Sequence, residues 1–114
     1  MSDEHSEQSG FVRWFRNKYP TILIFAIPNG SYRDMSTAKK LKKEGVVSGV
    51  PDLYVPKHHV WIEMKRKDGG VLSEEQKAMH HYLTMIGDTV IIGYGAEDAS
   101  RKVLGVIGQS PKHL

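Results

Sequence analysis

The chain has no cysteine among its 114 residues, which excludes disulfides, thiolate chemistry and cysteine-ligated zinc. It also lacks a long hydrophobic run. The longest, TILIFAI at residues 21–27, is far shorter than the ~20 residues that a membrane helix requires. The first residues, MSDEHSEQSG, have neither the basic region nor the apolar core of a signal peptide. These absences predict a soluble, cytoplasmic protein with no membrane partner.

Neither sign of charge is in large excess, because 16 lysines and arginines oppose 13 aspartates and glutamates, for a net charge of +3. Basic residues nevertheless cluster in AKKLKKEG at residues 38–45 and in MKRK at residues 64–67. A basic surface beside carboxylates would suit a polyanion held with a metal ion between them. A solvated lysine-rich face that keeps the protein soluble fits these runs equally well.

Hydrophobic spacing and turn residues predict alternating helices and strands within a single domain that spans residues 1–114. Helices are expected at residues 4–18, 34–45, 72–87 and 96–108, and strands at residues 21–27, 52–55, 60–65 and 89–94. The first strand should be buried, and the short PKHH link should join the second and third strands as a hairpin. This order predicts an α/β fold with a mixed sheet flanked by helices, flexible only at residues 1–4 and 109–114.

The segment SGVPDLYVPKHHVWIEMKRK, residues 48–67, places charged residues within strands. Residues two apart in a strand share a face, about 6.6 Å apart, so Glu63 and Lys65 should emerge together with Trp61. A hairpin would bring Asp52 close to Glu63, and two adjacent carboxylates persist only with a cation or a shared proton between them.

Hard oxygen ligands suit Mg²⁺ or Mn²⁺, which also bind a substrate's phosphate. A neighbouring lysine could hold the attacking water and offset charge in the transition state, so the segment predicts metal-assisted phosphodiester hydrolysis. The simpler alternative is an edge-strand charge pair that blocks aggregation, with Pro-Asp opening a turn.

GVPDLYV, followed eleven residues after its aspartate by IEMK, resembles the PD-(D/E)xK nuclease signature. Over residues 7–103 the chain resembles more narrowly the VRR-NUC family, in its standalone phage and bacterial form. The segments that carry this resemblance are EQSGFVRWFRNKYPTILIFAIPNG, AKKLKKEGVVSGVPDLYV, WIEMKRKDGGVLSEEQKAMHHYL and GDTVIIGYG. The resemblance implies a restriction-endonuclease-like core. It also implies that the protein acts in the cytoplasm of a bacterium or of a phage-infected host cell.

The resemblance also implies the roles of individual residues. Asp52 and Glu63 would be metal ligands together with the backbone carbonyl of Met64, and Lys65 would position the nucleophilic water. Glu7 would bind the metal directly or through water. Its helical spacing to Phe11 and Trp14 places it independently on the core-facing stripe. Alternatively, Glu7 is a first-turn carboxylate favoured by the helix dipole.

Gln76 matches the glutamine that follows the catalytic strand in this family and helps to orient the site, but it also has capping-box spacing to Ser73. His80 stands where related nucleases often have a tyrosine, which weakens the case for a larger role of this helix. Surface positions are expected for His80 and the other histidines at 58, 59 and 81, because adjacent histidines point apart.

A basic surface is expected to bind the DNA backbone without reading its sequence. Its candidate residues are Lys39, Lys40, Lys42, Lys43, Arg66 and Lys67. Met35, Ala38 and Leu41 should form the apolar side of the basic helix, and the loop at residues 29–33 should lie near the substrate.

Together these features predict a Mg²⁺- or Mn²⁺-dependent DNA endonuclease without a nucleotide cofactor. It is expected to act as a homodimer on branched DNA such as Holliday junctions. The alternatives are a non-catalytic nucleic-acid-binding module with a nuclease fold and a restriction-type, sequence-specific endonuclease.

Overall fold

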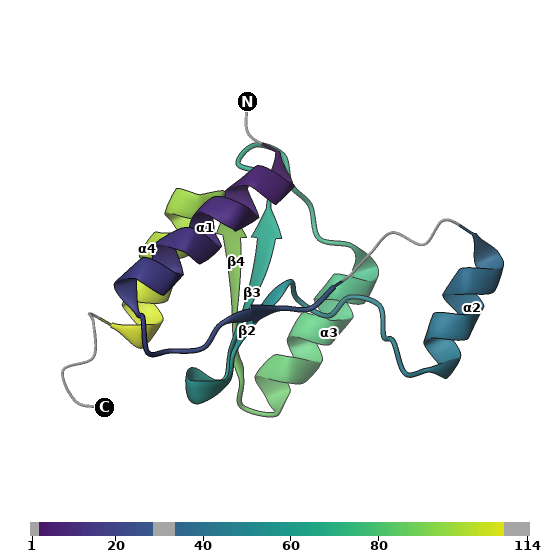
Figure 1. Ribbon diagram of the computed structural model, residues 1–114. Coiled ribbons are helices and arrows are strands. Elements are labelled where there is room, and N and C mark those ends of the chain that lie inside the picture. The colour runs from purple at the N-terminus through teal and green to yellow at the C-terminus, as the bar shows by residue number, and fades with distance from the viewer. Residues whose placement is uncertain (1–2, 29–33, 109–114) are drawn as a thin grey trace.

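A four-stranded mixed sheet forms the centre of the protein (Figure 1). The computed structural model describes residues 3–28 and 34–108. The strands are β1 (Phe25–Ala26), β2 (Leu53–Val55), β3 (Val60–Lys65) and β4 (Thr89–Tyr94), in the spatial order β1-β2-β3-β4. Strand β2 is antiparallel to both of its neighbours, β1 and β3, whereas β3 and β4 are parallel. The predicted hairpin and the predicted mixed sheet are both confirmed.

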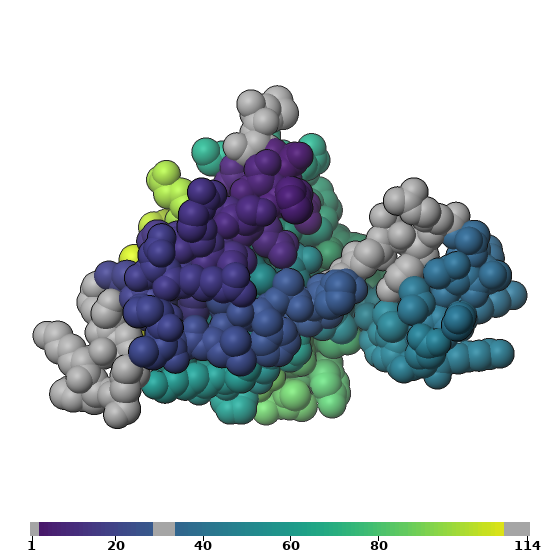
Figure 2. All heavy atoms as spheres, in the orientation of Figure 1, coloured from purple at the N-terminus to yellow at the C-terminus, as the bar shows by residue number. Residues whose placement is uncertain are grey.

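Helices cover the sheet unequally. Helices α1 (Glu4–Lys18) and α4 (Ala96–Ile107) pack together on one side, and α3 (Glu74–Met85) lies on the other (Figure 1). Helix α2 (Met35–Lys43) projects away from the body, as Figures 1 and 2 both show. No helix within the described residues combines the length and apolar character that crossing a membrane requires.

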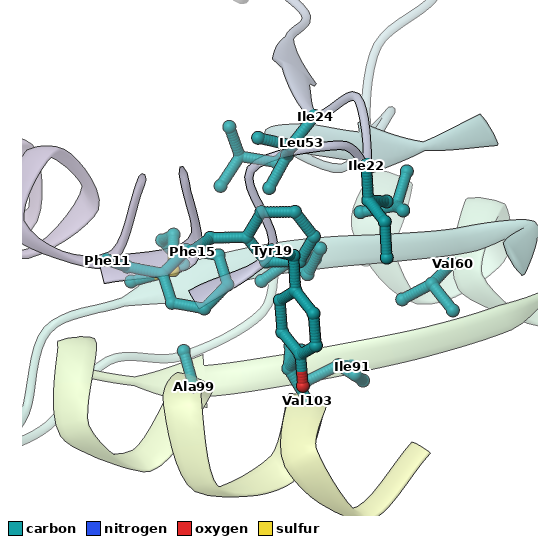
Figure 3. Close-up of a cluster of buried hydrophobic side chains, with 13 residues drawn as sticks. Phe11, Phe15, Tyr19, Ile22, Ile24, Leu53, Val60, Ile91, Ala99 and Val103 are labelled. Carbon is teal, nitrogen blue, oxygen red and sulfur yellow. The ribbon is translucent and has the colours of Figure 1, made fainter. Parts of the chain in front are cut away.

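The core lies between the sheet and the α1–α4 pair. Phe11 and Phe15 of α1 are completely buried with Tyr19 just after it, and the Tyr19 ring extends toward α4 at Val103 (Figure 3). The Tyr19 hydroxyl donates a hydrogen bond to the carbonyl of Gly108, which ties the end of α4 to this aromatic cluster. The sheet contributes Leu53, Val55, Val60, Ile62, Met64 and Ile91. The alternation predicted for residues 60–65 is therefore correct, with Ile62 and Met64 on the core side.

The prediction of a buried strand over residues 21–27 is wrong in extent. Only Phe25 and Ala26 pair with β2. Strand β1 lies at the edge of the sheet, and its neighbour β2 is only three residues long. Ile22 and Ile24 are buried, but Leu23 is 63% exposed and Phe25 41% exposed. An edge segment with one face open to solvent buries only alternate residues, although the sequence pattern is apolar throughout.

The apolar side predicted for α2 is not covered. None of the residues of α2 is buried, and Met35 is among the most exposed large hydrophobic residues. Met35, Ala38 and Leu41 line a shallow hollow with Val46 and Ser48 instead. Periodicity correctly identified the apolar stripe, but the helix projects from the body, and among residues 3–28 and 34–108 the stripe is only partly buried at Ala38 and Leu41.

The helix ends follow ordinary capping chemistry. Asp3 accepts a hydrogen bond from the backbone N–H of Ser6, and Asp34 does the same for Thr37. Asp3 and Glu4, expected to be flexible, thus form the ordered start of α1. The remaining residues expected to be flexible, 1–2 and 109–114, and the loop at 29–33 lie outside the described residues.

Candidate active site

The β2–β3 hairpin brings the two signature carboxylates together. Leu53 pairs with Ile62, so Asp52 stands one position beyond β2, across from Glu63. Asp52 Oδ2 accepts a hydrogen bond of 2.7 Å from the backbone N–H of Met64. The same register continued by two residues places Pro51 opposite Met64, and proline has no N–H to donate to the Met64 carbonyl. The PD sequence therefore leaves the Met64 carbonyl without a donor from Pro51, although Met64 itself is buried.

Glu63 is a buried carboxyl group with the strongest electrostatic perturbation in the site. Its side chain is 1% exposed; Oε2 accepts a hydrogen bond of 3.2 Å from Gln76 Nε2, and Oε1 lies 3.1 Å from His80 Nε2. Burial, followed by the negative charge of Asp52, raises the pKa of Glu63 to about 9. A proton on Glu63 or a nearby cation relieves the repulsion within this pair, and the positive charge of Lys65 already acts in that direction.

Gln76 carries out both of the roles that its sequence position suggested. Its Oε1 accepts from the backbone N–H of Ser73 at 2.9 Å, which completes the capping box of α3. Its Nε2 simultaneously donates to Glu63. The cap fixes the side chain at the start of α3, so the amide is oriented toward the carboxylate before any ligand binds.

His80 is a site residue that the sequence interpretation assigned to the surface. Its side chain is only 11% exposed and lies against Glu63. Burial, followed by the positive charge of Lys65, lowers the pKa of His80, so the imidazole is neutral near pH 7. The signal was present in the spacing: His80 lies one helical turn after Gln76, and residues four apart share a helix face.

Two glutamates of α1 contribute differently. Glu7 is buried, and its Oε1 accepts a hydrogen bond of 2.6 Å from the backbone N–H of Ala96, the first residue of α4. A carboxylate at a helix N-terminus is favoured by the helix dipole. Glu4, one turn earlier, is the α1 carboxylate whose charge contributes to the raised pKa of Glu63. The sequence interpretation missed Glu4, and a metal-binding role for Glu7 stays a prediction.

Lys65 lies buried on the same strand as Glu63, two residues away. The loop after β3 passes close to it, because a Cβ added at Gly70 would stand 2.7 Å from Lys65 Cβ. Any larger residue at this position would push the loop away from the lysine. The glycine therefore lets the chain close over Lys65 and limits its contact with water.

The donor set fits a hard divalent cation. Within residues 3–28 and 34–108, no group of three or more histidine, aspartate and glutamate side chains is placed to hold a metal on its own. Two carboxylates and one backbone carbonyl leave coordination positions for water and a phosphate oxygen, which is how Mg²⁺ is commonly bound. The arrangement suits Mg²⁺ or Mn²⁺ better than an all-protein zinc cage.

The predicted DNA-binding residues fall into two groups. Arg66 and Lys67 are exposed and follow directly after Lys65 at the end of β3. The four lysines of α2 are also exposed, on the helix that projects from the body (Figure 2). The chain after α2 returns to the site, since Gly49 packs so closely on the N-terminus of α3 that an added Cβ would lie 2.4 Å from the Glu75 carbonyl oxygen.

A mixed sheet with an Asp and a Glu-x-Lys on adjoining strands defines a restriction-endonuclease-like α/β core. No family model matches the sequence, and no curated protein matches it either. A solved structure described as "VRR_NUC domain protein" is similar, with a TM-score of 0.73 and 18% sequence identity. The match covers 96% of this chain and 92% of that chain. The chain therefore has the VRR-NUC fold, as its motifs predicted.

Proposed function

We propose that the protein is a Mg²⁺- or Mn²⁺-dependent endonuclease that hydrolyses DNA phosphodiester bonds. The observation that supports this most directly is the buried Asp52–Glu63 pair beside Lys65. A charge pair that only protects an edge strand would be solvated, whereas Glu63 lies on the interior strand β3 at 1% exposure. Burying repelling carboxylates is costly, and a metal-dependent activity accounts for that cost.

In the proposed mechanism, Asp52, Glu63 and the Met64 carbonyl would hold the divalent cation, which would supply positive charge to neutralise the phosphate and to make water a stronger nucleophile. The Lys65 ammonium orients the attacking water and offsets negative charge as the phosphorus gains its fifth oxygen. Gln76 and His80 hold the Glu63 carboxylate in one orientation through hydrogen-bonding contacts.

The acidic residues of α1 complete the proposal. Glu4 adds negative charge near Glu63 and so favours binding of a cation there. Glu7 acts on the metal directly or through water, as the family resemblance implies, while its Oε1 accepts from the N-terminus of α4. Exposed lysines of α2, together with Arg66 and Lys67, contact DNA phosphates and position the backbone without reading bases.

The proposed substrate is branched DNA, such as a Holliday junction, cut by a homodimer. A two-fold dimer presents two active sites, which suits paired incisions across a two-fold junction. A non-catalytic docking module is the alternative class, but it would have no use for a buried carboxylate pair. A restriction-type, sequence-specific endonuclease is the other alternative.

The test compares cleavage of a labelled four-way junction with cleavage of a matched linear duplex, in Mg²⁺, Mn²⁺ or EDTA. Lys65→Ala should lower the metal-dependent rate by about 100-fold or more, as expected for a lost electrostatic contact in the transition state. Lys77→Ala is the matched control, because Lys77 is exposed and paired with Glu74 on α3.

Equal cutting of both DNAs would retain the nuclease but remove junction selectivity. Binding without cutting in any metal would favour the docking module. Sedimentation with bound junction tests the homodimer, and a purely monomeric complex would contradict it.

A further inference from the structure

Strand β1 lies at the edge of the sheet, and the direction of its backbone groups follows from its pairing with β2. In an antiparallel ladder, opposite residues alternate between pairs that exchange two backbone hydrogen bonds and pairs that exchange none. The N–H of Ile27 donates a hydrogen bond of 2.8 Å to the carbonyl of Asp52, which is the residue opposite it in this register. Ile27 and Phe25 therefore bond to β2. Ala26 and Ile24 alternate with them and direct their backbone groups to the open edge.

Helix α1 already reaches this open edge. Arg16 Nη2 donates a hydrogen bond of 3.3 Å to the Ile24 carbonyl, as the alternation predicts for a carbonyl on the open side. Among residues 3–28 and 34–108, no group pairs with the outward N–H and C=O of Ala26. An edge strand pairs readily with another strand, and a charged residue placed at the edge limits such pairing. Arg16 therefore restricts the edge to a strand that can satisfy its guanidinium group.

A hollow of about 540 Å³, here called the edge groove, lies between α1 and β1. Its basic residues are His5, Arg13 and Arg16, and no carboxylate is among the described residues that line it. Within the part of the chain that the structure describes, neither arginine belongs to an ion pair. The apolar part of the lining comes from α1 and from the core face of the sheet: Val12, Ile24 and Leu53. The edge groove thus carries unpaired positive charge beside an open strand edge.

The opposite face of the same segment is apolar and exposed. Leu23 and Phe25 are open to solvent there, whereas Ile22 and Ile24 are buried in the core. A strand added alongside β1 would follow the same alternation of side chains. Every second side chain would enter the edge groove, and those between would contact Leu23 and Phe25.

We propose that the open edge of β1 and the edge groove bind an extended acidic peptide of a protein partner, which adds a strand to the sheet. The peptide backbone bonds to Ala26, and its acidic side chains contact Arg13 and Arg16. Its apolar side chains alternate with the acidic ones and pack on Leu23 and Phe25. This docking site is separate from the proposed nuclease activity, because the edge groove opens on the core face of the sheet.

The chemistry of the edge favours a peptide over a nucleic acid. A strand edge presents N–H donors and C=O acceptors together, and another peptide backbone satisfies both. A phosphate backbone would meet the arginines, but it would also bring its negative oxygens against the outward carbonyls of Ile24 and Ala26. The peptide must be acidic because Arg16 has to exchange the Ile24 carbonyl for a new acceptor, and a carboxylate is the stronger partner for a guanidinium group.

Binding is measured by fluorescence anisotropy with a fluorescein-labelled peptide of alternating glutamate and valine, and with the same peptide carrying glutamine in place of glutamate. The wild type should bind the glutamate peptide at least about 5-fold more tightly at low salt. Arg13→Gln and Arg16→Gln should each reduce this preference. Lys57→Gln is the matched control, because Lys57 is exposed at the turn between β2 and β3, outside the edge groove.

Ala26→Pro tests the backbone contact. Proline removes the outward N–H but none of the hydrogen bonds to β2, because Ala26 does not bond to that strand. Binding of the glutamate peptide should weaken by about 10-fold or more, whereas Ala26→Ser keeps the N–H and should bind like wild type. In the wild type, hydrogen exchange at the Ala26 amide should slow when the peptide binds, and this readout does not depend on the folding of a variant.

Equal binding of the two peptides, or unchanged exchange at the Ala26 amide, would overturn the inference. So would single-stranded DNA that binds in place of the peptide, weakly to Arg13→Gln and Arg16→Gln but normally to Ala26→Pro, because the edge groove would then be a nucleic-acid surface. Self-association of the wild type that Ala26→Pro abolishes would assign the edge to a second copy of the chain instead. None of these measurements involves cleavage, so they are read independently of Lys65→Ala.

Discussion

Replacing Glu63 with glutamine is expected to stabilise the metal-free protein while abolishing cleavage. Burial, and then the charge of Asp52, raises the pKa of Glu63 from 4.5 to about 9, so folding near neutral pH forces this carboxyl group to take up a proton. Glutamine is already neutral and has nearly the same shape. Its carbonyl can accept from Gln76, and its amide can donate to Asp52.

The magnitude follows from the pH of the measurement. The unfolded group loses its proton near pH 4.5, whereas the folded group keeps it up to about pH 9. A group whose pKa is higher in the folded state than in the unfolded state stabilises the fold, and here this contribution is complete below pH 4.5. The contribution is lost as the pH rises toward 9. At pH 7 the wild type has lost about 3 kcal/mol of this contribution to its free energy of unfolding, at 1.36 kcal/mol per pH unit. The loss at pH 7 depends only on the folded pKa being higher than 7.

Urea denaturation in EDTA at a series of pH values measures this difference. Glu63→Gln and wild type should be equally stable near pH 4, and the variant should be more stable by about 3 kcal/mol at pH 7. Added Mg²⁺ should stabilise wild type and leave the variant largely unchanged, because only a ligand that binds the folded state shifts its stability. Glu75→Gln, at an exposed position on α3, controls for removal of a negative charge.

Two outcomes would refute this reasoning. A variant less stable than wild type at pH 7 would mean that the hydrogen bonds to Gln76 and His80 stabilise more than the protonation costs. A stability difference that does not change between pH 4 and pH 8 would mean that Glu63 titrates normally and that the carboxylate pair is not strained.

One α1 glutamate should act on stability and the other on metal binding. Glu7→Gln should lower the free energy of unfolding by about 1 kcal/mol, because it removes a negative charge at the α4 N-terminus, and denaturation measures this. Glu4→Gln should leave stability unchanged but weaken Mg²⁺ binding, measured by calorimetry; equal effects of both substitutions on Mg²⁺ would contradict this division. Gly93→Ala should destabilise by about 1–3 kcal/mol, because the new Cβ would stand 2.5 Å from Ala99 Cβ. Gly105→Ala has open space and should instead stabilise α4 by about 0.5–1 kcal/mol, so thermal melts should move in opposite directions.

What the sequence predicted well depends on local patterns. The hairpin, the capping box of α3 and the alternation of β3 each follow from residues close together in the chain, and each is present. The α2 stripe shows the limit of such patterns. Spacing identifies which side of a helix is apolar, but the tertiary arrangement decides whether anything covers it. Within residues 34–108, α2 simply extends away from its neighbours (Figure 1).

The missed site residues share one cause. His80 of α3 contacts Glu63 and the charge of Glu4 on α1 acts on it, so their participation depends on how two helices cross the sheet. The spacing of Gln76 and His80 shows that they share a face of α3, but no local spacing reports the crossing angle that turns this face toward Glu63, and a glutamate in a first turn is ordinary in sequence. Gln76 was identified only because the family resemblance supplied the tertiary information.

The core and the carboxylate pair, in contrast, are specified by a single register. A shift of one residue in the β2–β3 pairing would turn Ile62 and Met64 toward solvent and place Glu63 and Lys65 against Phe11 and Phe15. The burial of the apolar residues therefore holds the charged residues in place on the opposite face. Any substitution that keeps the hairpin register, even in the core, should preserve the site geometry, whereas changes in α1 or α3 can remove Glu4 or His80 from the site without unfolding the sheet.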